Sequence, residues 1–370
     1  MKASDGRNTR AVGTLLGIVL LSVIGAWTLE AQTKYPNVNL AGRLQQHFYY
    51  FDNGDYAAAT GPTTGMFTRR ARITAKGQIA ENVSFIIQPS FEDGSTRVRL
   101  RDAYIDVRLT KPEATTSMGV RVGQEKRPFG RYELTSSNNL PSLERGAGRG
   151  LLKASSNDLF IGNGFLSHDI GAALRLQTSV GQGRALTLHA GVYNGEGESA
   201  KEVNNAKSFG VRATVDVTDK LNVGGSFFSH DGIVDVQGVP DSSFTNQAFG
   251  IDAQWGAPGS EGLYAVGDFM YGEDDSENIL TIWGLSLVSA YHIRMADKES
   301  FLYAIEPAVR FDFSDPDKDT DDNGTTIITA GVNFYLSSKT RFQVMYENQS
   351  FQASGLESIQ GIRTALAVSF

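Results

Sequence analysis

The sequence predicts an all-β protein, a 16-stranded antiparallel transmembrane β-barrel with a long third loop folded into the pore. Three observations favour this fold class. After residue 36, sixteen segments of roughly ten residues alternate apolar and polar positions, and the gaps between them alternate in length. The last segment is an amphipathic strand that ends on Phe370. Short turns on one side and long loops on the other are typical of an outer-membrane barrel.

The N-terminus precedes the first expected strand and has the pattern of a signal peptide. Lys2, Arg7 and Arg10 are followed by an uncharged apolar run at residues 11–29 and by small residues near Ala26 and Ala31. This predicts a signal peptide at residues 1–31, cleaved near Ala31, and a barrel domain at residues 32–370. An uncleaved membrane anchor is the alternative, because the run approaches the length that spans a bilayer.

The period-2 pattern predicts the strands one after another along the chain. No second apolar run of that length follows, so the mature chain can enter a membrane only as a closed barrel, in which the strands satisfy their own backbone groups. The expected strands are residues 40–51, 66–78, 82–92, 97–109, 115–126, 164–177, 184–194, 206–217, 220–230, 246–256, 261–272, 279–292, 300–313, 325–336, 339–349 and 360–370.

The faces of these strands agree with a barrel wall. In the segment at 300–313, Ile305, Val309 and Phe311 share one face, while Glu306 and Arg310 lie on the other. A soluble sandwich would show the same alternation, so the faces alone do not decide between the two architectures. Aromatic residues near the ends of many strands favour the barrel, because they fit interfacial girdles.

The final strand adds a further signal. Ile362, Thr364, Leu366, Val368 and Phe370 share one face, and the chain ends there on an aromatic residue. This ending is similar to the C-terminal signal by which outer-membrane proteins are recognised for insertion.

The longest gap between expected strands, residues 127–163, is also the only long gap with a clear excess of basic residues. In and beside it, six basic residues face only Glu133, Glu144 and Asp158. A loop of this length can fold into the lumen of a barrel and narrow it. We therefore expect this segment to decide which solutes pass.

Inward-facing charges are expected to divide between two sides of the pore. Basic residues lie on the first two strands and on the last two, which are neighbours in a closed barrel. Inward acids, Asp216, Asp252, Asp268, Glu306 and Asp312, lie on the strands opposite. With the basic loop added at the constriction, the pattern predicts a moderate preference for anions. For any single arginine, an ion pair that stiffens the wall is an equally good interpretation.

The candidate pore-lining or constriction residues share a basic side chain and an expected inward or loop position. They are Arg43, Arg70, Arg72, Lys76, Arg121, Lys126, Arg127, Arg131, Arg145, Arg149, Lys153, Arg341 and Arg363. Arg69, Arg99 and Arg101 fall on the outward register instead. Because charges that face lipid at mid-depth are costly, we expect these three near an interface or at a break in register.

Three stretches carry a family resemblance. Residues 67–77 (FTRRARITAKG), 100–109 (LRDAYIDVRL) and 123–146 (GQEKRPFGRYELTSSNNLPSLERG) resemble the phosphate-selective porin O and P family. The resemblance implies a sixteen-stranded trimeric porin whose third loop enters the pore. It also implies phosphate or polyphosphate as candidate solutes. The expected fifth loop at 231–245, however, has no basic residue, which departs from the cation-rich loops of the family.

Other functional classes find little support in the sequence. The chain has 370 residues, no cysteine and a net charge of −7, and it offers no basic surface for nucleic acid. Its five histidines are scattered and no nucleophile or nucleotide motif is present, so we expect neither an enzyme nor a cofactor nor a resident metal. The acidic run at 314–324 resembles a calcium loop without its glutamate, and a solvated loop is the simpler interpretation.

The expected function is therefore a passive outer-membrane channel for small hydrophilic solutes, with a weak preference for anions. The expected partners are outer-membrane lipid, lipopolysaccharide, small solutes or anions, and two further copies of the chain in a homotrimer. A structural or adhesive outer-membrane barrel with a plugged lumen is the alternative.

Overall fold

The computed structural model describes residues 34–370 except 96, 235–241, 275–279 and 298–299. The expected signal peptide at 1–31 and the middle of the expected fifth loop lie outside the described residues. The strands are β1 (Asn37–Asp52), β2 (Thr64–Ala80), β3 (Val83–Glu92), β4 (Val98–Arg108), β5 (Ser117–Lys126), β6 (His168–Val180), β7 (Arg184–Tyr193), β8 (Ser208–Asp216), β9 (Leu221–Val234), β10 (Ser242–Trp255), β11 (Gly262–Asp274), β12 (Leu280–Arg294), β13 (Ala304–Asp315), β14 (Thr325–Ser337), β15 (Thr340–Phe351) and β16 (Ile359–Ser369).

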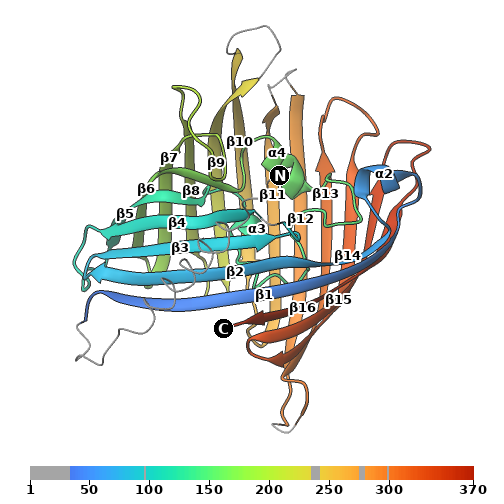
Figure 1. Ribbon diagram of the computed structural model, residues 1–370. Coiled ribbons are helices and arrows are strands. Elements are labelled where there is room, and N and C mark those ends of the chain that lie inside the picture. The colour runs from blue at the N-terminus through green and yellow to red at the C-terminus, as the bar shows by residue number, and fades with distance from the viewer. Residues whose placement is uncertain (1–33, 96, 235–241, 275–279, 298–299) are drawn as a thin grey trace, which may run out of the picture.

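These strands form one closed antiparallel barrel in which each strand pairs with its neighbours in sequence (Figure 1). The ring closes between β1 and β16, with a register that runs from Arg43 opposite Ser369 to Asp52 opposite Gln360. The predicted number of strands and their antiparallel order are confirmed. Each predicted boundary lies within four residues of the observed one.

The side chains alternate between lipid and lumen as the strands run. In β13, Glu306, Arg310 and Asp312 are buried on the inside, whereas Val309 and Phe311 are exposed on the outside. An apolar outer band is what contact with lipid requires. In the described part of the chain, no helix has the length and hydropathy of a membrane-spanning helix.

Two irregular pairings explain the three arginines that the simple alternation placed outward. Gln45 pairs with Arg70 and Gln46 with Thr68, so Arg69 is an extra residue of β2. Ile87 pairs with Ala103 and Pro89 with Leu100, which leaves an extra residue in β4 beside Arg101. A proline cannot donate a ladder hydrogen bond, so a bulge beside Pro89 is expected.

Each bulge reverses the register locally, and the arginines turn inward to acids. Arg69 lies 2.6 Å from Glu144, and Arg101 and Arg99 both reach Glu198. The predicted register break therefore occurs at Arg69 and beside Arg101, and Arg99 lies inward just before the second bulge.

The remaining helical turns are short. The 3-10 helix η1 (Gly54–Tyr56) and α2 (Ala57–Thr60) lie between β1 and β2. Two others, α3 (Arg131–Leu134) and α4 (Ser156–Gly162), belong to residues 127–167, which join β5 to β6. We call residues 127–167 the inner segment, because in Figure 1 both of its helices lie within the ring of strands.

An apolar cluster holds the inner segment against the wall. Phe129, Phe160 and Phe165 of the segment are fully buried and pack with Phe228 of β9 and Met270 of β11. Burying large aromatic side chains stabilises such a contact by about 2 kcal/mol each. The segment is thus an ordered part of the fold.

Candidate functional site

The inner segment has few sheet partners, so its backbone groups need other hydrogen bonds. Polar side chains that point inward from the wall supply many of them. The amide of Asn333 donates to the carbonyl of Pro141 at 2.9 Å, and the guanidinium of Arg341 donates to that of Leu140 at 3.0 Å. Gln349 both donates to and accepts from the backbone of Leu152.

The predicted inward acids on the opposite side of the barrel also bind groups of the inner segment. Asp312 accepts hydrogen bonds from the backbone N–H of Ser156 at 2.8 Å and from its hydroxyl at 2.6 Å. Asp268 accepts from the N–H of Tyr132 at 3.0 Å, and Asp252 pairs with Arg131. These carboxylates therefore fasten the segment to β10, β11 and β13.

A glycine-rich run lets the segment approach the opposite wall. At Gly148, an added Cβ would lie 1.6 Å from the Nη1 atom of Arg363. At Gly150, which has a φ of +93°, it would lie 2.2 Å from the ring of Phe51. Only glycine permits both the close approach and the left-handed backbone.

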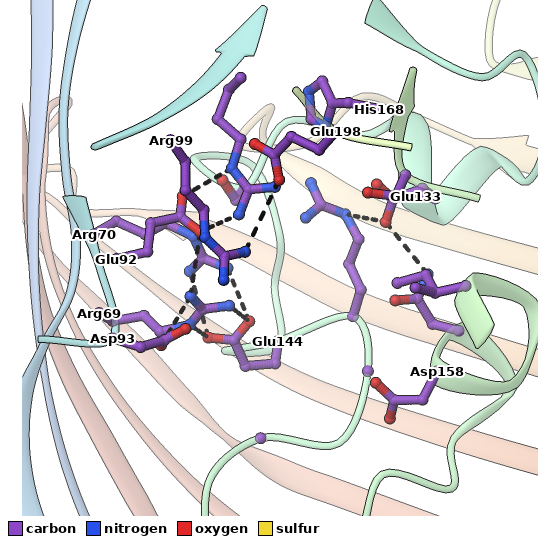
Figure 2. Close-up of a pocket in the computed structure, with 18 of the residues that line it drawn as sticks. Arg69, Arg70, Glu92, Asp93, Arg99, Glu133, Glu144, Asp158, His168 and Glu198 are labelled. Carbon is purple, nitrogen blue, oxygen red and sulfur yellow. Dashed lines mark hydrogen bonds and ion pairs between the residues drawn. The ribbon is translucent and has the colours of Figure 1, made fainter. Parts of the chain in front are cut away.

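Between the segment and the wall made by β1 to β4 and β16 lies a cavity of about 900 Å³. Figure 2 shows Arg69, Arg70 and Glu92 on one side of it, with Glu133 and Asp158 facing them from the inner segment. Among the described residues that line the cavity, eleven are basic and seven are acidic. The lining therefore carries an excess of four positive charges.

Most of the basic residues are held by carboxylates. Glu144, on the inner segment, lies 2.6 Å from Arg69 and 2.8 Å from Arg70. Glu92, on β3, pairs with Arg72 and Arg101. The network connects the segment to the wall. Its carboxylates also offset part of the positive charge that would otherwise attract anions.

Glu133 and Glu144 of the inner segment stay ionised in this setting. Burial alone would raise the pKa of Glu133, but Lys126 and Arg145 outweigh it and lower that pKa to about 2. Burial likewise opposes the ionised form of Glu144, and Arg69 and Arg70 outweigh it, so its pKa lies well below its ordinary value. Opposite charges at ion-pair distance favour the charged form of a carboxyl.

Eight of the predicted pore residues line the cavity: Arg43, Arg70, Arg72, Lys126, Arg145, Arg149, Lys153 and Arg363. Within the described part of the chain, three of the cavity's cations have no carboxylate within 4.0 Å. Arg43 donates to the hydroxyl of Ser137, Arg149 to the carbonyl of Asp93 at 3.2 Å, and Lys153 to that of Ala147 at 2.7 Å.

The other five predicted residues are not part of this lining. Arg127 is buried and lies 2.7 Å from Asp169, and Arg131 pairs with Asp252, so both hold the segment in place. The remaining three lie elsewhere on the wall. Arg341 donates a hydrogen bond to the carbonyl of Leu140, and Arg121 pairs with Asp106 at 2.8 Å. Lys76 is exposed near the C-terminal end of β2.

Several lining residues were missing from the sequence prediction. They are Arg69, Arg99, Arg101, His47, Phe67, Ile161 and Glu198. The only signal for the three arginines was their cost on the outer face, which implied a register break. Glu198 lies in the loop after β7 and pairs with Arg101 at a distance of 2.9 Å. The sequence carries no comparable signal for this residue.

The described residues contain no group of three or more His, Cys, Asp or Glu side chains that could hold a metal ion. In the acidic run at 314–324, Asp317 and Asp319 make local bonds with Thr320 and Lys318. Asp315 accepts a hydrogen bond from the indole N–H of Trp283 at 2.9 Å.

Comparisons with known proteins agree with this architecture. A sequence profile of the phosphate-selective porin O and P family matches residues 38–226, just over half of the chain. No curated protein matches the chain.

Solved structures with a similar fold are outer-membrane porins. An anion-selective porin from Comamonas acidovorans is 13% identical with a TM-score of 0.60, covering 90% of this chain and 100% of that one. OmpF of Salmonella typhi, in complex with daunomycin, is 14% identical with a TM-score of 0.59, covering 92% and 100%. OmpT of Vibrio cholerae, in its trimer form, is 12% identical with a TM-score of 0.57, covering 90% and 99%. At these identities the likeness concerns the fold.

Proposed function

Because the chain belongs to the phosphate-selective porin O and P family and is an outer-membrane diffusion channel, we propose that its pore prefers anions weakly. The proposal has one main support. Arg43, Arg149 and Lys153 line the cavity and have no carboxylate partner within 4.0 Å among the described residues. Arg149 and Lys153 are exposed, so their charges are accessible to anions in the cavity, and Arg43 adds a buried charge to its lining.

The preference should be weak, because most of the other cations are paired. A unit charge at about 4 Å and an effective dielectric near 20 contributes about 4 kcal/mol before desolvation and salt screening reduce it. Conduction needs several shallow sites along the path, since one deep site would hold the ion. Cations interleaved with carboxylates produce such a profile.

The sign of selectivity in planar bilayers tests this proposal. With a tenfold gradient of potassium chloride, the reversal potential should have the sign of chloride preference. The triple variant R43Q/R149Q/K153Q should bring it closer to zero. A preference for potassium in the native channel would contradict the proposal.

A pore without conduction would favour the second function, a structural or adhesive barrel whose lumen the inner segment fills. The specific observation behind that alternative is the buried aromatic cluster around Phe129 and Phe160, which occupies part of the lumen. Steady ohmic current steps would decide for the channel.

We propose phosphate and polyphosphate as permeant anions among others. Bi-ionic reversal potentials with phosphate on one side and chloride on the other measure their relative permeability. A ratio near one would match a weakly selective pore, and a large phosphate excess would match a dedicated one.

We also propose a homotrimer, by analogy with the trimer form of OmpT, which has a similar fold. Light scattering of the detergent-solubilised protein would give the mass of three chains. A single chain per particle would contradict this assembly.

A further inference from the structure

The charged cavity also presents an apolar surface, which a channel for inorganic ions does not need. Ile161, on α4, lines the cavity and leaves 41% of its area exposed there. Leu134 of the inner segment and Phe67 of β2 line the same cavity. The lumen of a transmembrane barrel is ordinarily polar, so these side chains distinguish the cavity from a simple water column.

Phe67 is flanked by two groups that can donate hydrogen bonds. The guanidinium carbon of Arg149 lies 4.6 Å from the centre of its ring, and the ring of His47 meets it edge-on at 5.4 Å. Arg149 is exposed, and the only hydrogen bond that its guanidinium donates to the described residues goes to the carbonyl of Asp93. Both ring nitrogens of His47, which is only 2% exposed, have no hydrogen-bond partner among the described residues.

Cations without a carboxylate partner adjoin this apolar surface. Arg149 stacks on Phe67, and the amine of Lys153 donates to the carbonyl of Ala147, which packs in the same apolar cluster as Phe67. The N–H of Ala147 is in turn bound by Asp158, three residues before Ile161 on α4. Cationic and apolar elements therefore meet in one place.

From this arrangement we propose that the cavity binds organic carboxylates with a short hydrocarbon body. The carboxylate pairs with Arg149 and Lys153, and the hydrocarbon part covers Phe67 and Ile161. A phosphate ion would meet the same cations but would gain nothing from the apolar side chains. This inference rests on the proposed anion preference and adds the class of solute.

Current block with matched anions tests the proposal in the full-length channel. Chloride current is recorded while acetate, hexanoate or inorganic phosphate is added at equal concentration. Hexanoate has four more methylenes than acetate, and each buried methylene contributes about 0.8 kcal/mol when fully covered. With partial cover, hexanoate should reduce the current at a concentration about tenfold lower than acetate, and phosphate should resemble acetate.

Two variants separate the apolar contact from the charge. Ile161→Ser should abolish most of the advantage of hexanoate over acetate. Leu356→Ser changes an exposed apolar residue outside the cavity lining, with 48% of its area accessible, and it should keep the advantage. Equal block by acetate and hexanoate in the native channel would overturn the inference, even if the pore prefers chloride.

A second measurement distinguishes failure of the proposed anion preference from failure of the proposed carboxylate site. If the channel is silent or prefers potassium, calorimetric titration of the detergent-solubilised protein with hexanoate and with acetate replaces the block. Ile161→Ser in the same micelles corrects for partition of hexanoate into detergent. Tighter binding of hexanoate to the native protein than to this variant would support the site, and equal heats would refute it.

Discussion

Glu144 limits the anion preference at the scale of a single residue. Its carboxylate pairs with both Arg69 and Arg70, which line the cavity, and offsets one of their two positive charges. Glu144→Gln should leave Arg70 without its carboxylate partner, whereas Arg69 keeps Asp93 at 3.1 Å. The chloride-to-potassium permeability ratio should rise by at least about twofold, since the cavity gains one positive charge. Reversal potentials measure this ratio.

The matched control for this variant is Glu113→Gln, which makes the same charge change in the exposed turn between β4 and β5. It should leave the ratio unchanged. An equal rise in both variants would show that overall charge, and not the pairing of Glu144, sets selectivity.

Glu133 supplies a pH prediction. Its folded-state pKa is about 2, below the ordinary value of 4.5, so its pairing with Lys126 and Arg145 stabilises the folded state fully above pH 4.5. The contribution declines as pH falls and is lost through about pH 2. Because Glu133 stays paired at both pH 7 and pH 5, its contribution to the single-channel conductance should be the same at these two pH values. That contribution should change only in more acidic solution.

Glu133→Gln removes the titrating group and provides the comparison. The low-pH change in conductance should be smaller in this variant than in the native channel. An identical acid response in both proteins would assign the effect to other carboxyls.

The inner segment is the element whose fastening decides the shape of the pore. Asp312 holds two groups of Ser156 at the start of α4 and pairs with Arg310 at 2.7 Å. Asp312→Asn should leave Arg310 without its carboxylate, and loss of one partner of a buried pair costs about 3 to 5 kcal/mol. The expected result is a more mobile segment, seen as larger and noisier current steps.

Asp319→Asn is a suitable control, because that carboxylate is exposed and its only bond to the described residues is with its neighbour Lys318 at 2.8 Å. Current steps of unchanged size and noise in Asp312→Asn would contradict a fastening role for Asp312.

The barrel could be predicted from the sequence at this scale, but the site could be predicted only in part. Alternation between lipid and lumen is a local pattern, so all sixteen strands are visible in the chain. The partners of the inner segment are not local. Arg131 meets Asp252 across 121 positions, and Ser156 meets Asp312 across 156.

Two features of the site could not be predicted from the sequence. The bulges at Arg69 and beside Arg101 depend on ladder geometry, which side-chain alternation does not reveal. The division of arginines into paired and free ones depends on how deeply the inner segment enters the lumen. Arg127 and Arg149 look alike in the sequence, yet one is buried against Asp169 and the other is exposed in the cavity.

For the whole molecule, the critical step is the closure of the ring between β1 and β16. An unclosed barrel would expose two strand edges with unsatisfied backbone groups, which lipid cannot solvate. The last residue completes this seam. Phe370 exchanges two backbone hydrogen bonds with Gly42, at 3.0 and 3.1 Å, and its ring covers the space where a side chain of Gly42 would lie.

Phe370→Ala should keep both backbone bonds but lose the ring that covers Gly42. A cross-strand aromatic residue over a glycine contributes about 1 kcal/mol, so the variant should unfold at lower urea concentration and refold into micelles with lower yield. Heat-dependent mobility on gels separates the closed barrel from the unfolded chain. Phe301→Ala, which removes an exposed ring before the start of β13, should behave like the native protein. If Phe370→Ala matched the native midpoint, the two backbone bonds alone would account for the strength of the seam.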